Sequence, residues 1–335
     1  MGILSSRASK ELVLAFPSAG RRVELLSEFR AAAERLGRTA RIVVWDRDAL
    51  APAFKVADRS LSVPSITDPS YVPIVLDVLR RERVDFIFPL IDPEILLLAQ
   101  HRREIEQTGA RPVVISCKAA AVAEDKWQTF QFFSSIGLKT PKTWLPEEPA
   151  PEGQGFPLFV KPRRGSASAG AVKVRNEAEL RFFSGYLNSP LVQEFLSGPE
   201  ITSDVVADLD GKVLAVVSRQ RLEVRTGEVS KGVTVFDQRI LDGCLAIARA
   251  LPAVGPVTVQ CLMHEGEPRF TEINARLGGG FPLGLAAGAN SLDWFLGRSL
   301  GVEVAIPPLG TYRIGTHMTR YDGSFYLEPD EALRA

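Results

Sequence analysis

The sequence predicts an α/β protein in which a parallel sheet with helices on both faces is followed by an α+β part. In the first third of the chain, short apolar runs alternate with segments of helical periodicity, which is typical of strands joined by crossover helices. After residue 123, strand pairs joined by polar turns predominate instead. We therefore expect one domain at 1–116 and a second at 117–335.

The first domain should alternate strands and helices along the chain. A buried strand leads through a turn at 17–22 to a helix that ends near Leu36, and Asp68 and Asp92 are N-cap candidates for two later helices. The expected strands are 11–16, 40–45, 85–90 and 112–116, and the later helices are 69–83 and 93–107.

Ligands of open parallel sheets bind beyond the carboxyl ends of the strands. Six polar or small residues follow the expected strands and are candidates for ligand contact: Ser18, Gly20, Arg21, Asp46, Asp92 and Glu94. Each of them also has a plain alternative as a helix cap or turn residue.

The second domain should begin with a helix at 126–137, followed by a proline-rich connector. A mobile lid is expected at about 156–190, and a larger sheet, a helix and a β-hairpin follow it. In chain order, the expected elements are strands 158–161 and 171–174, helix 176–187, strands 191–195, 201–208, 213–219 and 221–235, helix 237–250, the hairpin at 257–276 and helix 290–300.

Composition removes several classes of function. The 335 residues hold 40 basic and 40 acidic side chains, so the strong basic excess of a nucleic-acid-binding protein is missing. No run of about 18 apolar residues predicts a membrane span. The three cysteines and three histidines show no spacing for a disulfide framework, a zinc site or a hydrolase nucleophile. Without an apolar leader in residues 1–10, we expect a cytoplasmic location.

The hairpin carries the most informative residues of the chain. Its second strand reads Thr271-Glu272-Ile273-Asn274-Ala275-Arg276, and strand alternation puts Glu272, Asn274 and Arg276 on one face. Carboxylate and amide oxygens suit Mg²⁺, and a guanidinium suits phosphate oxygens. The alternative is a solvated strand face. The following Gly278-Gly279-Gly280 favours a ligand, because consecutive glycines let the backbone approach one closely.

A basic, small-residue loop at 163–170 is a second candidate for phosphate binding. It matches neither the Walker A pattern nor the dinucleotide fingerprint, but its backbone N–H groups can still hold phosphates, with Ser166 and Ser168 as candidate contacts. Lys161 before it would add a point charge. The segment 193–200 offers backbone groups for a purine edge and a carboxylate for a ribose. An ordinary polar hairpin and a strand end are the alternatives.

Together these segments resemble the ATP-grasp superfamily, and most closely its carbamoyl-phosphate-synthase-like single-unit members. The resemblance rests on Phe159-Val160-Lys161-Pro162, on Gln193-Glu194-Phe195 with Gly198-Pro199-Glu200, and on the strand 272–276. It implies a Rossmann-like, pre-ATP-grasp parallel-sheet domain followed by a two-subdomain α+β ATP-grasp module.

The resemblance also implies roles for single residues. Lys126 and Lys161 would hold ATP phosphates, Glu194 and Leu196 would border the adenine, and Glu200 would bind the ribose. Magnesium would be held by Gln260, Glu272 and Asn274, with Mn²⁺ as an alternative metal, and Arg276 would contact the transferred phosphoryl group or acyl phosphate. Gln260 departs from the family pattern, because many relatives carry a carboxylate there.

The implied activity is that of an ATP-dependent carboxylate–amine ligase that forms an acyl phosphate and releases ADP and phosphate. Lys161, Arg219 and Arg276 are the expected catalytic residues, and Arg221 is a weaker candidate. A solvated strand face, with Glu223 or Glu228 as partners, is the alternative for Arg219 and Arg221.

Small carboxylates and amines, rather than nucleic acid or membrane, are the expected partners. The oligomeric state stays open, with a homodimer as one option. A carbamate- or bicarbonate-phosphorylating enzyme and a non-catalytic nucleotide-binding regulator are the competing functions.

Overall fold

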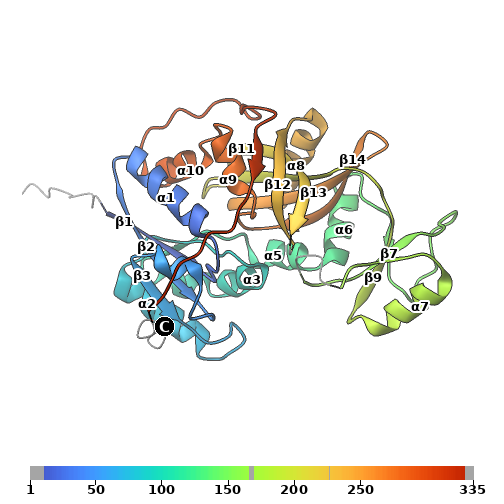
Figure 1. Ribbon diagram of the computed structural model, residues 1–335, viewed down its shortest axis with the longest axis horizontal. Helices are drawn as coiled ribbons and strands as arrows, with labels where there is room; N and C mark the ends of the chain where they lie inside the picture. Colours follow the sequence, from blue (N-terminus) through green and yellow to red (C-terminus); the bar gives the residue numbers. More distant parts are fainter. Residues whose placement is uncertain (1–10, 166–169, 226, 329–335) are drawn as a thin grey trace, which may run out of the picture. The chain divides into compact units, whose positions relative to one another are not determined.

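The computed structural model describes residues 11–165, 170–225 and 227–328. The chain divides into two compact units (Figure 1). Unit 1 comprises Met1–Val113, Asn290–Ile306 and Gly323–Ala335, and unit 2 comprises Val114–Ala289 and Pro307–Asp322. The division after Val113 falls close to the expected boundary, but residues 290–306 return to the first unit instead of staying with the second.

Unit 1 is built on a five-stranded sheet in the order β3-β2-β1-β4-β5, and every pairing in it is parallel. Its strands are β1 (Glu11–Pro17), β2 (Thr39–Asp46), β3 (Arg59–Ser62), β4 (Phe86–Ile87) and β5 (Arg111–Pro112). Burial explains the apolar runs, since β1 is buried from its second residue to its end. The predicted α/β class with an N-terminal parallel sheet is confirmed.

The helices of unit 1 are α1 (Val23–Arg35), α2 (Tyr71–Glu82), α3 (Asp92–Gln100), α4 (Arg102–Glu106) and α10 (Ser291–Leu300), with a 3₁₀ turn at Pro52–Lys55. The helix expected at 93–107 is divided at His101. α10 belongs to this unit because Phe295 packs edge-on against Phe86 and Phe88, and because Arg35 forms a bidentate ion pair with Asp293.

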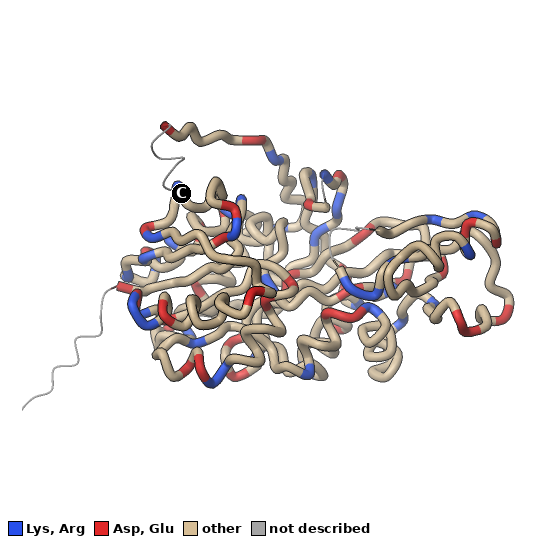
Figure 2. The backbone as a smooth tube through the Cα atoms, turned by 90° about the horizontal axis from the view of Figure 1, so that it is seen from below, with Lys and Arg blue, Asp and Glu red and all other residues tan. Residues whose placement is uncertain are grey.

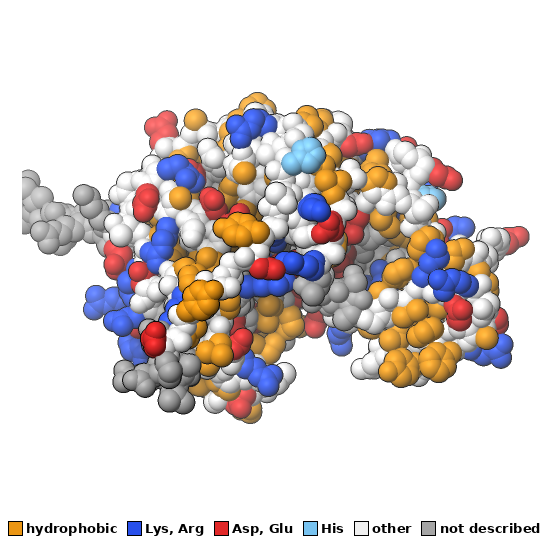
Figure 3. All heavy atoms as spheres, in the orientation of Figure 1, with side chains coloured by type: hydrophobic (Ala, Val, Ile, Leu, Met, Phe, Trp, Pro, Cys, Tyr) orange, Lys and Arg blue, Asp and Glu red, His pale blue; other side chains and the backbone are white. Residues whose placement is uncertain are grey.

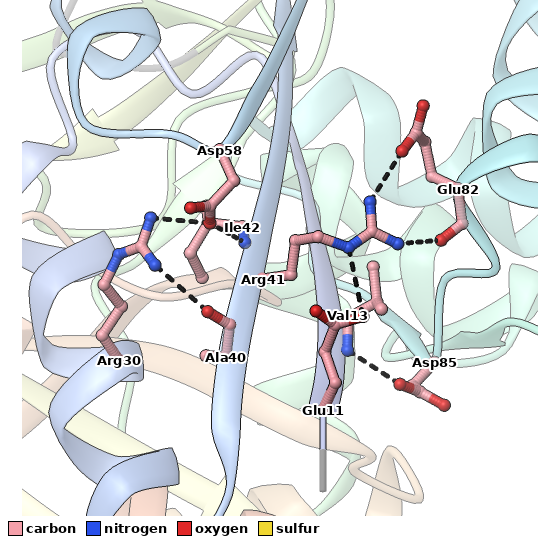
Figure 4. Close-up of polar contacts among 9 residues, drawn as sticks. All are labelled: Glu11, Val13, Arg30, Ala40, Arg41, Ile42, Asp58, Glu82 and Asp85. Carbon is pink, nitrogen blue, oxygen red and sulfur yellow. Dashed lines mark hydrogen bonds and ion pairs between the residues drawn. The ribbon is translucent and has the colours of Figure 1, made fainter. Parts of the chain in front are cut away.

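Polar contacts at the amino ends of the strands fix the sheet of unit 1 (Figure 4). Arg41 donates to the Glu82 carboxylate at 2.7 Å and to its backbone oxygen at 2.5 Å. Arg30 donates to Asp58 at 2.7 Å, and the same carboxylate oxygen accepts the Ile42 N–H. These contacts lie at the opposite edge from the carboxyl ends, where ligands of parallel sheets bind.

Several predicted boundaries differ from the structure. The strands expected at 85–90 and 112–116 are assigned only two residues each, although ladder-type bonds continue from Phe88 N–H to Ala15 and from Val113 N–H to Ile87. The exposed edge strand β3 was not predicted. Asp68 is not the cap of α2: it accepts bonds from Ser70, the residue that precedes the helix.

Unit 2 contains a six-stranded antiparallel sheet in the order β14-β13-β10-β11-β12-β15. The strands are β10 (Glu200–Ala207), β11 (Val213–Arg225), β12 (Glu228–Val235), β13 (Gly255–His264), β14 (Glu267–Asn274) and β15 (His317–Thr319). Helix α8 (Gln238–Ala250) buries an apolar stripe that includes Ile240, Cys244 and Ile247. The remaining helices of this unit outside the lid are α5 (Cys117–Glu124), α6 (Lys126–Ser135) and α9 (Phe281–Ala286).

A smaller sheet in unit 2, here called the lid sheet, has the order β6-β9-β7-β8. It consists of β6 (Thr143–Trp144), β7 (Leu158–Pro162), β8 (Val172–Val174) and β9 (Pro190–Glu194), with helix α7 (Glu177–Tyr186) packed on it. Trp144 and Val192 belong to its compact core. On its outer side α7 exposes Phe182 and Tyr186, and Figure 3 shows hydrophobic side chains grouped over this part of the chain.

Basic and acidic residues are interspersed along both units (Figure 2). This distribution agrees with the equal numbers of the two kinds in the sequence. Among the residues that the structure describes, no helix has the length and apolar character needed to cross a bilayer.

Candidate functional site

A cavity of about 290 Å³ lies in unit 2 between the lid sheet and the six-stranded sheet. Its walls come from β7, β9, β13 and β14, with α6 at one end. Seven of the predicted site residues line it: Lys126, Lys161, Glu194, Leu196, Glu200, Gln260 and Glu272. Segments up to 146 residues apart in sequence therefore converge on one cavity of the size that holds a small-molecule ligand.

Strand β7 supplies Phe159 and Lys161 to the cavity because side chains alternate along it. Leu158 and Val160 face the lid core, which leaves Phe159 and Lys161 on the cavity side. Removal from water lowers the pKa of Lys161 to about 8, although nearby Glu272 opposes the shift. The ammonium donates to the amide oxygen of Gln193 at 3.0 Å.

Lys126, the first residue of α6, brings a second ammonium to the same end of the cavity. Its Nζ lies 3.4 Å from Glu272 and donates to the backbone oxygen of Gly165 at 2.5 Å. Asp125 caps α6 and accepts a bidentate pair of bonds from Arg163. Burial alone would raise the pKa of Asp125, but these hydrogen bonds hold it below its ordinary value. The Asp125–Arg163 ion pair thus connects the start of α6 to the end of β7.

A β-bulge decides which residues of β14 face the cavity. Gln260 pairs with Glu272, but the next residue, Cys261, pairs with Phe270, so Thr271 is the extra residue. Before the bulge the even-numbered residues of β14 are buried, as at Phe270, and after it the odd-numbered residues are buried, as at Ile273. The bulge thus turns Glu272 toward the cavity.

Three side chains with oxygen atoms meet around Gln260. The end of its amide lies 3.3 Å from Glu200 Oε1 and 3.1 Å from Glu272 Oε2. With the amide nitrogen turned toward them, Gln260 donates to both carboxylates; with the oxygen turned toward them, three oxygens converge. Arg221 donates to Glu200 at 2.5 Å, so Arg221 pairs with Glu200 and not with Glu223 or Glu228 as considered above.

This donor set fits a hard divalent cation. Oxygen ligands suit Mg²⁺, and few carboxylates are needed when phosphate oxygens complete the shell. Among the described residues, no group of three or more His, Cys, Asp and Glu side chains is placed to hold a metal. The side-chain oxygens that meet here are those of Glu200, Glu272 and the Gln260 amide.

The end of β9, an inner strand of the lid sheet, and the residues that follow it also line the cavity. The Glu194 carboxylate accepts the Lys142 backbone N–H at 2.8 Å, while the Glu194 N–H donates to the Lys142 oxygen. Its side chain is therefore engaged with the connector before β6. Phe195, Leu196 and Leu262 supply apolar wall there, and Lys173 lies over the Phe195 ring at 3.7 Å.

Arg219 does not line the cavity. Its side chain is 3% exposed and forms a two-bonded ion pair with Asp204, at 2.9 and 3.3 Å. A Cβ atom on Gly280 would lie 2.5 Å from Arg219 Nη1, and one on Gly278 would lie 2.9 Å from Nη2. In the structure Arg219 thus packs against the glycine turn beside Asp204, and its predicted catalytic role stays a prediction.

The other predicted residues are placed as follows. Asn274 ends β14, its backbone oxygen accepts the Arg276 N–H, and neither Asn274 nor Arg276 is among the residues that line the cavity. Arg276 is held in the turn by Thr258, whose hydroxyl donates to the Arg276 backbone oxygen at 2.9 Å. Ser166 and Ser168 lie outside the described residues.

Four of the six candidates of unit 1, namely Ser18, Gly20, Asp46 and Glu94, form polar contacts within that unit. Ser18 and Tyr71 donate to Glu94 at 2.8 and 2.5 Å, and the Gly20 N–H donates to Asp46 at 2.8 Å. Glu94 is fully buried, and burial raises the pKa of its carboxyl to about 7. The contacts join the ends of β1 and β2 to the start of α3, so the carboxyl edge of the sheet is internally bonded.

Sequence reasoning missed the side-chain roles of Gln193 and Thr143 and the apolar walls Phe159 and Leu262. Alternation on β7 would have identified Phe159, since it shares a face with Lys161. No sequence signal relates Thr143 to Gln193, because their contact depends on the pairing of β6 with β9.

Comparison with known proteins gives matches to both parts of the chain. Residues 14–114 match the PylC-like N-terminal domain family, and residues 187–316 match the family described as ATP-grasp in the biosynthetic pathway with Ter operon. The first match spans the parallel sheet of unit 1. The second spans the cavity-lining residues of β9, β13 and β14.

Individual relatives agree with these matches. The arginine-specific large chain of carbamoyl phosphate synthase from Bacillus subtilis is 24% identical over 243 residues, which are 67% of this chain and 23% of that protein. The 3-methyl-D-ornithine–L-lysine ligase of Methanosarcina barkeri is 26% identical over 238 residues, which are 70% of this chain and 60% of that protein. The chain thus spans less than two thirds of the length of either relative.

Solved structures share the fold. The crystal structure of N5-carboxyaminoimidazole synthetase from Staphylococcus aureus complexed with ADP superposes with a TM-score of 0.71 and 16% identity, over 88% of this chain and 79% of that chain. The resemblance to ATP-grasp proteins that the sequence motifs predicted is therefore confirmed: residues 187–316 match an ATP-grasp family, and residues 14–114 match a PylC-like N-terminal domain.

Proposed function

We propose that the protein is an ATP-dependent ligase, which activates a carboxylate as an acyl phosphate and couples it to an amine. The observation that carries this proposal is the cavity that Lys126 and Lys161 line together with Glu272, Gln260 and the end of β9. The two matched families and the amino-acid ligase among the relatives support it. That ligase is named for joining two amino acids, so an amino acid or a related small molecule is the proposed amine.

The cavity accommodates a nucleotide in one direction. The adenine would lie against Phe195, Leu196 and Leu262, where the backbone that follows β9 would supply hydrogen-bonding groups. Glu200 would accept bonds from the ribose hydroxyls. The phosphates would then reach Lys126 and Lys161, whose charges match phosphate oxygens.

Magnesium would be held by Glu272 with the amide oxygens of Gln260 and Asn274. Bound there, it would neutralise phosphate charge as the phosphoryl group transfers. Lys126 Nζ lies 3.4 Å from Glu272, so a cationic side chain stands beside the carboxylate that would hold the metal.

The reaction would proceed in two transfers. A carboxylate oxygen attacks the γ-phosphorus, the bond from phosphorus to the β–γ bridging oxygen breaks, and ADP leaves. The amine then attacks the acyl carbon, loses a proton and expels phosphate. Lys161 would hold the γ-phosphate oxygens, and Arg276 is proposed to stabilise the acyl phosphate. Phosphoryl transfer needs this positioning and charge more than a covalent group of the protein.

The lid sheet would exclude water from the acyl phosphate. Its β7 and β9 already form one wall of the cavity. Exclusion matters because an acyl phosphate exposed to water is lost to hydrolysis.

The first expected result concerns the site of phosphoryl attack. With carboxyl-¹⁸O acid, amine and ATP, we expect ADP and ¹⁸O-labelled phosphate, because the cations lie at the proposed γ-phosphate end. Nucleotides are resolved by chromatography and the phosphate by mass spectrometry. AMP with pyrophosphate would contradict the acyl phosphate route, whereas ADP formed from bicarbonate alone would favour a carbamoyl-phosphate-type reaction. Binding without any turnover would favour a regulatory role.

The second expected result is a pH dependence of nucleotide affinity. Only the protonated amine of Lys161 attracts phosphate, and its pKa is about 8, so affinity should fall as pH rises through that value. Calorimetry with a non-hydrolysable ATP analogue measures the effect. The Lys161→Arg variant should lose most of this dependence, since a guanidinium stays charged. A flat profile in the wild type would remove Lys161 from the phosphate site.

A further inference from the structure

A chain of hydrogen bonds crosses the lid sheet from Lys161 on β7, through the buried side chain of Gln193 on β9, to Thr143 on β6. Lys161 Nζ donates to Gln193 Oε1 at 3.0 Å, and Gln193 Nε2 donates to Thr143 Oγ1 at 2.8 Å. The Thr143 hydroxyl in turn donates to the backbone oxygen of Pro141 at 2.9 Å. Gln193 is 8% exposed and Thr143 is 6% exposed, so water does not compete freely for these bonds.

The bonds have a fixed direction. A hydroxyl has one proton, and Thr143 gives it to Pro141, so its oxygen is an acceptor toward Gln193. The amide must then present its nitrogen to Thr143 and its oxygen to Lys161. Turned by 180°, the amide would place its N–H groups against the ammonium. Thr143, 50 residues before Gln193 in the sequence, therefore determines that the amide oxygen of Gln193, and not its nitrogen, faces Lys161.

The Gln193 amide accepts a hydrogen bond from the Lys161 ammonium without neutralising its charge. Of the charged groups near Lys161, Glu272 on β14 raises its pKa and Lys126 on α6 lowers it. Gln193 on β9 adds a hydrogen bond but no charge. A carboxylate there would form an ion pair and compete with a phosphate for the same ammonium.

We propose that Gln193 and Thr143 are positioning residues, which fix the Lys161 ammonium as a charged donor at the phosphate end of the cavity. This inference rests on the proposed nucleotide site. It extends that site to Thr143, which does not line the cavity.

The test compares Thr143→Val with Thr143→Ser. Valine keeps nearly the shape of threonine but removes the hydroxyl, whereas serine keeps the hydroxyl. In Thr143→Val, affinity for a non-hydrolysable ATP analogue should fall about tenfold, the size expected for losing a bond to a charged group. Its decline with pH should also begin at lower pH, because the ammonium loses its fixed acceptor. Thr143→Ser should stay within about twofold of the wild type.

A second variant should shift the pKa of Lys161 in the opposite direction. Gln193→Glu places a carboxylate on Lys161, so the ammonium should persist to higher pH. Nucleotide affinity at neutral pH should nevertheless fall, because the new ion pair competes with phosphate. A purely structural role for Gln193 predicts neither shift.

A direct titration separates this inference from the proposed function. The ¹³Cε signal of Lys161, assigned with Lys161→Arg, reports its pKa in the full chain without nucleotide. We expect a lower pKa in Thr143→Val, a higher one in Gln193→Glu, and no change in Thr143→Ser. The same Lys161 pKa in the wild type and in all three variants would overturn the positioning role of Gln193 and Thr143, even if ATP binds. If no ATP binds to the wild type, the proposed function fails, while the titration still decides whether Gln193 and Thr143 position Lys161.

Discussion

Replacing Arg219 by methionine should lower the free energy of unfolding by about 3–5 kcal/mol, because it leaves a buried carboxylate without its partner. Asp204 is 4% exposed and receives two bonds from the Arg219 guanidinium. The Thr258 hydroxyl lies 3.4 Å from Asp204, but its one proton goes to the Arg276 backbone oxygen at 2.9 Å. Equilibrium urea denaturation measures the change.

A double variant tests whether the unpaired charge is the cause. Arg219→Met combined with Asp204→Leu removes both charges, so most of the lost stability should return. The exposed pair of Lys231 and Glu223, also on adjacent strands, is the matched control. Its Lys231→Met variant should change stability by at most about 0.5 kcal/mol. A loss of similar size at both sites would contradict the buried-pair argument.

The consequence for the site lies in the glycine turn. Gly278 and Gly280 leave the space that the Arg219 guanidinium occupies, and any side chain on Gly280 would overlap it. The ion pair and the glycines thus form one packed unit directly after Arg276. Arg219 thus packs against that turn although it does not line the cavity.

The sequence predicted the elements whose burial pattern is local. β1 is a continuous apolar run, α8 has an apolar stripe of helical period, and the β13–β14 hairpin combines two apolar-rich strands with a polar turn. The missed elements have no such pattern. β3 is an exposed edge strand defined by its pairing with β2, and β15 has three residues paired with the edge of β12. Their conformation depends on a partner strand and not on their own residues.

The candidate site shows the same division. Lys161 and Glu272 were predictable because one precedes a small-residue loop and the other belongs to a polar strand face. Simple alternation, however, would bury every second residue along the whole of β14. The bulge at Thr271 shifts this pattern by one residue in the middle of the strand. Arg219 was assigned to a solvated or substrate-binding face because the sequence does not reveal Asp204 on the neighbouring strand. Ion pairs between strands follow from register, which short-range patterns do not specify.

Removing Glu272 or Lys161 should have the largest effect on activity. Lys161→Ala should weaken ATP binding by roughly 1.5–3 kcal/mol, because a charge-assisted contact to phosphate is lost. Glu272→Ala should lower turnover by about 10²–10³-fold, the range found when one preorganised electrostatic contact is removed. Steady-state production of ADP and phosphate measures both variants. Glu223→Ala, which removes an exposed carboxylate on β11, is the control and should leave turnover unchanged.

Metal dependence distinguishes the roles of the two residues. Glu272 lies 3.4 Å from Lys126 and opposes the lowered pKa of Lys161, so without metal its carboxylate repels phosphate at this end of the cavity. Glu272→Ala should therefore bind metal-free ATP at least as tightly as the wild type. The gain in affinity that Mg²⁺ gives the wild type should be smaller in this variant, because one oxygen ligand is missing. Lys161→Ala should weaken binding with and without Mg²⁺. Wild-type turnover in Glu272→Ala, or an equal gain from Mg²⁺ in both proteins, would show that Glu272 does not ligate the metal.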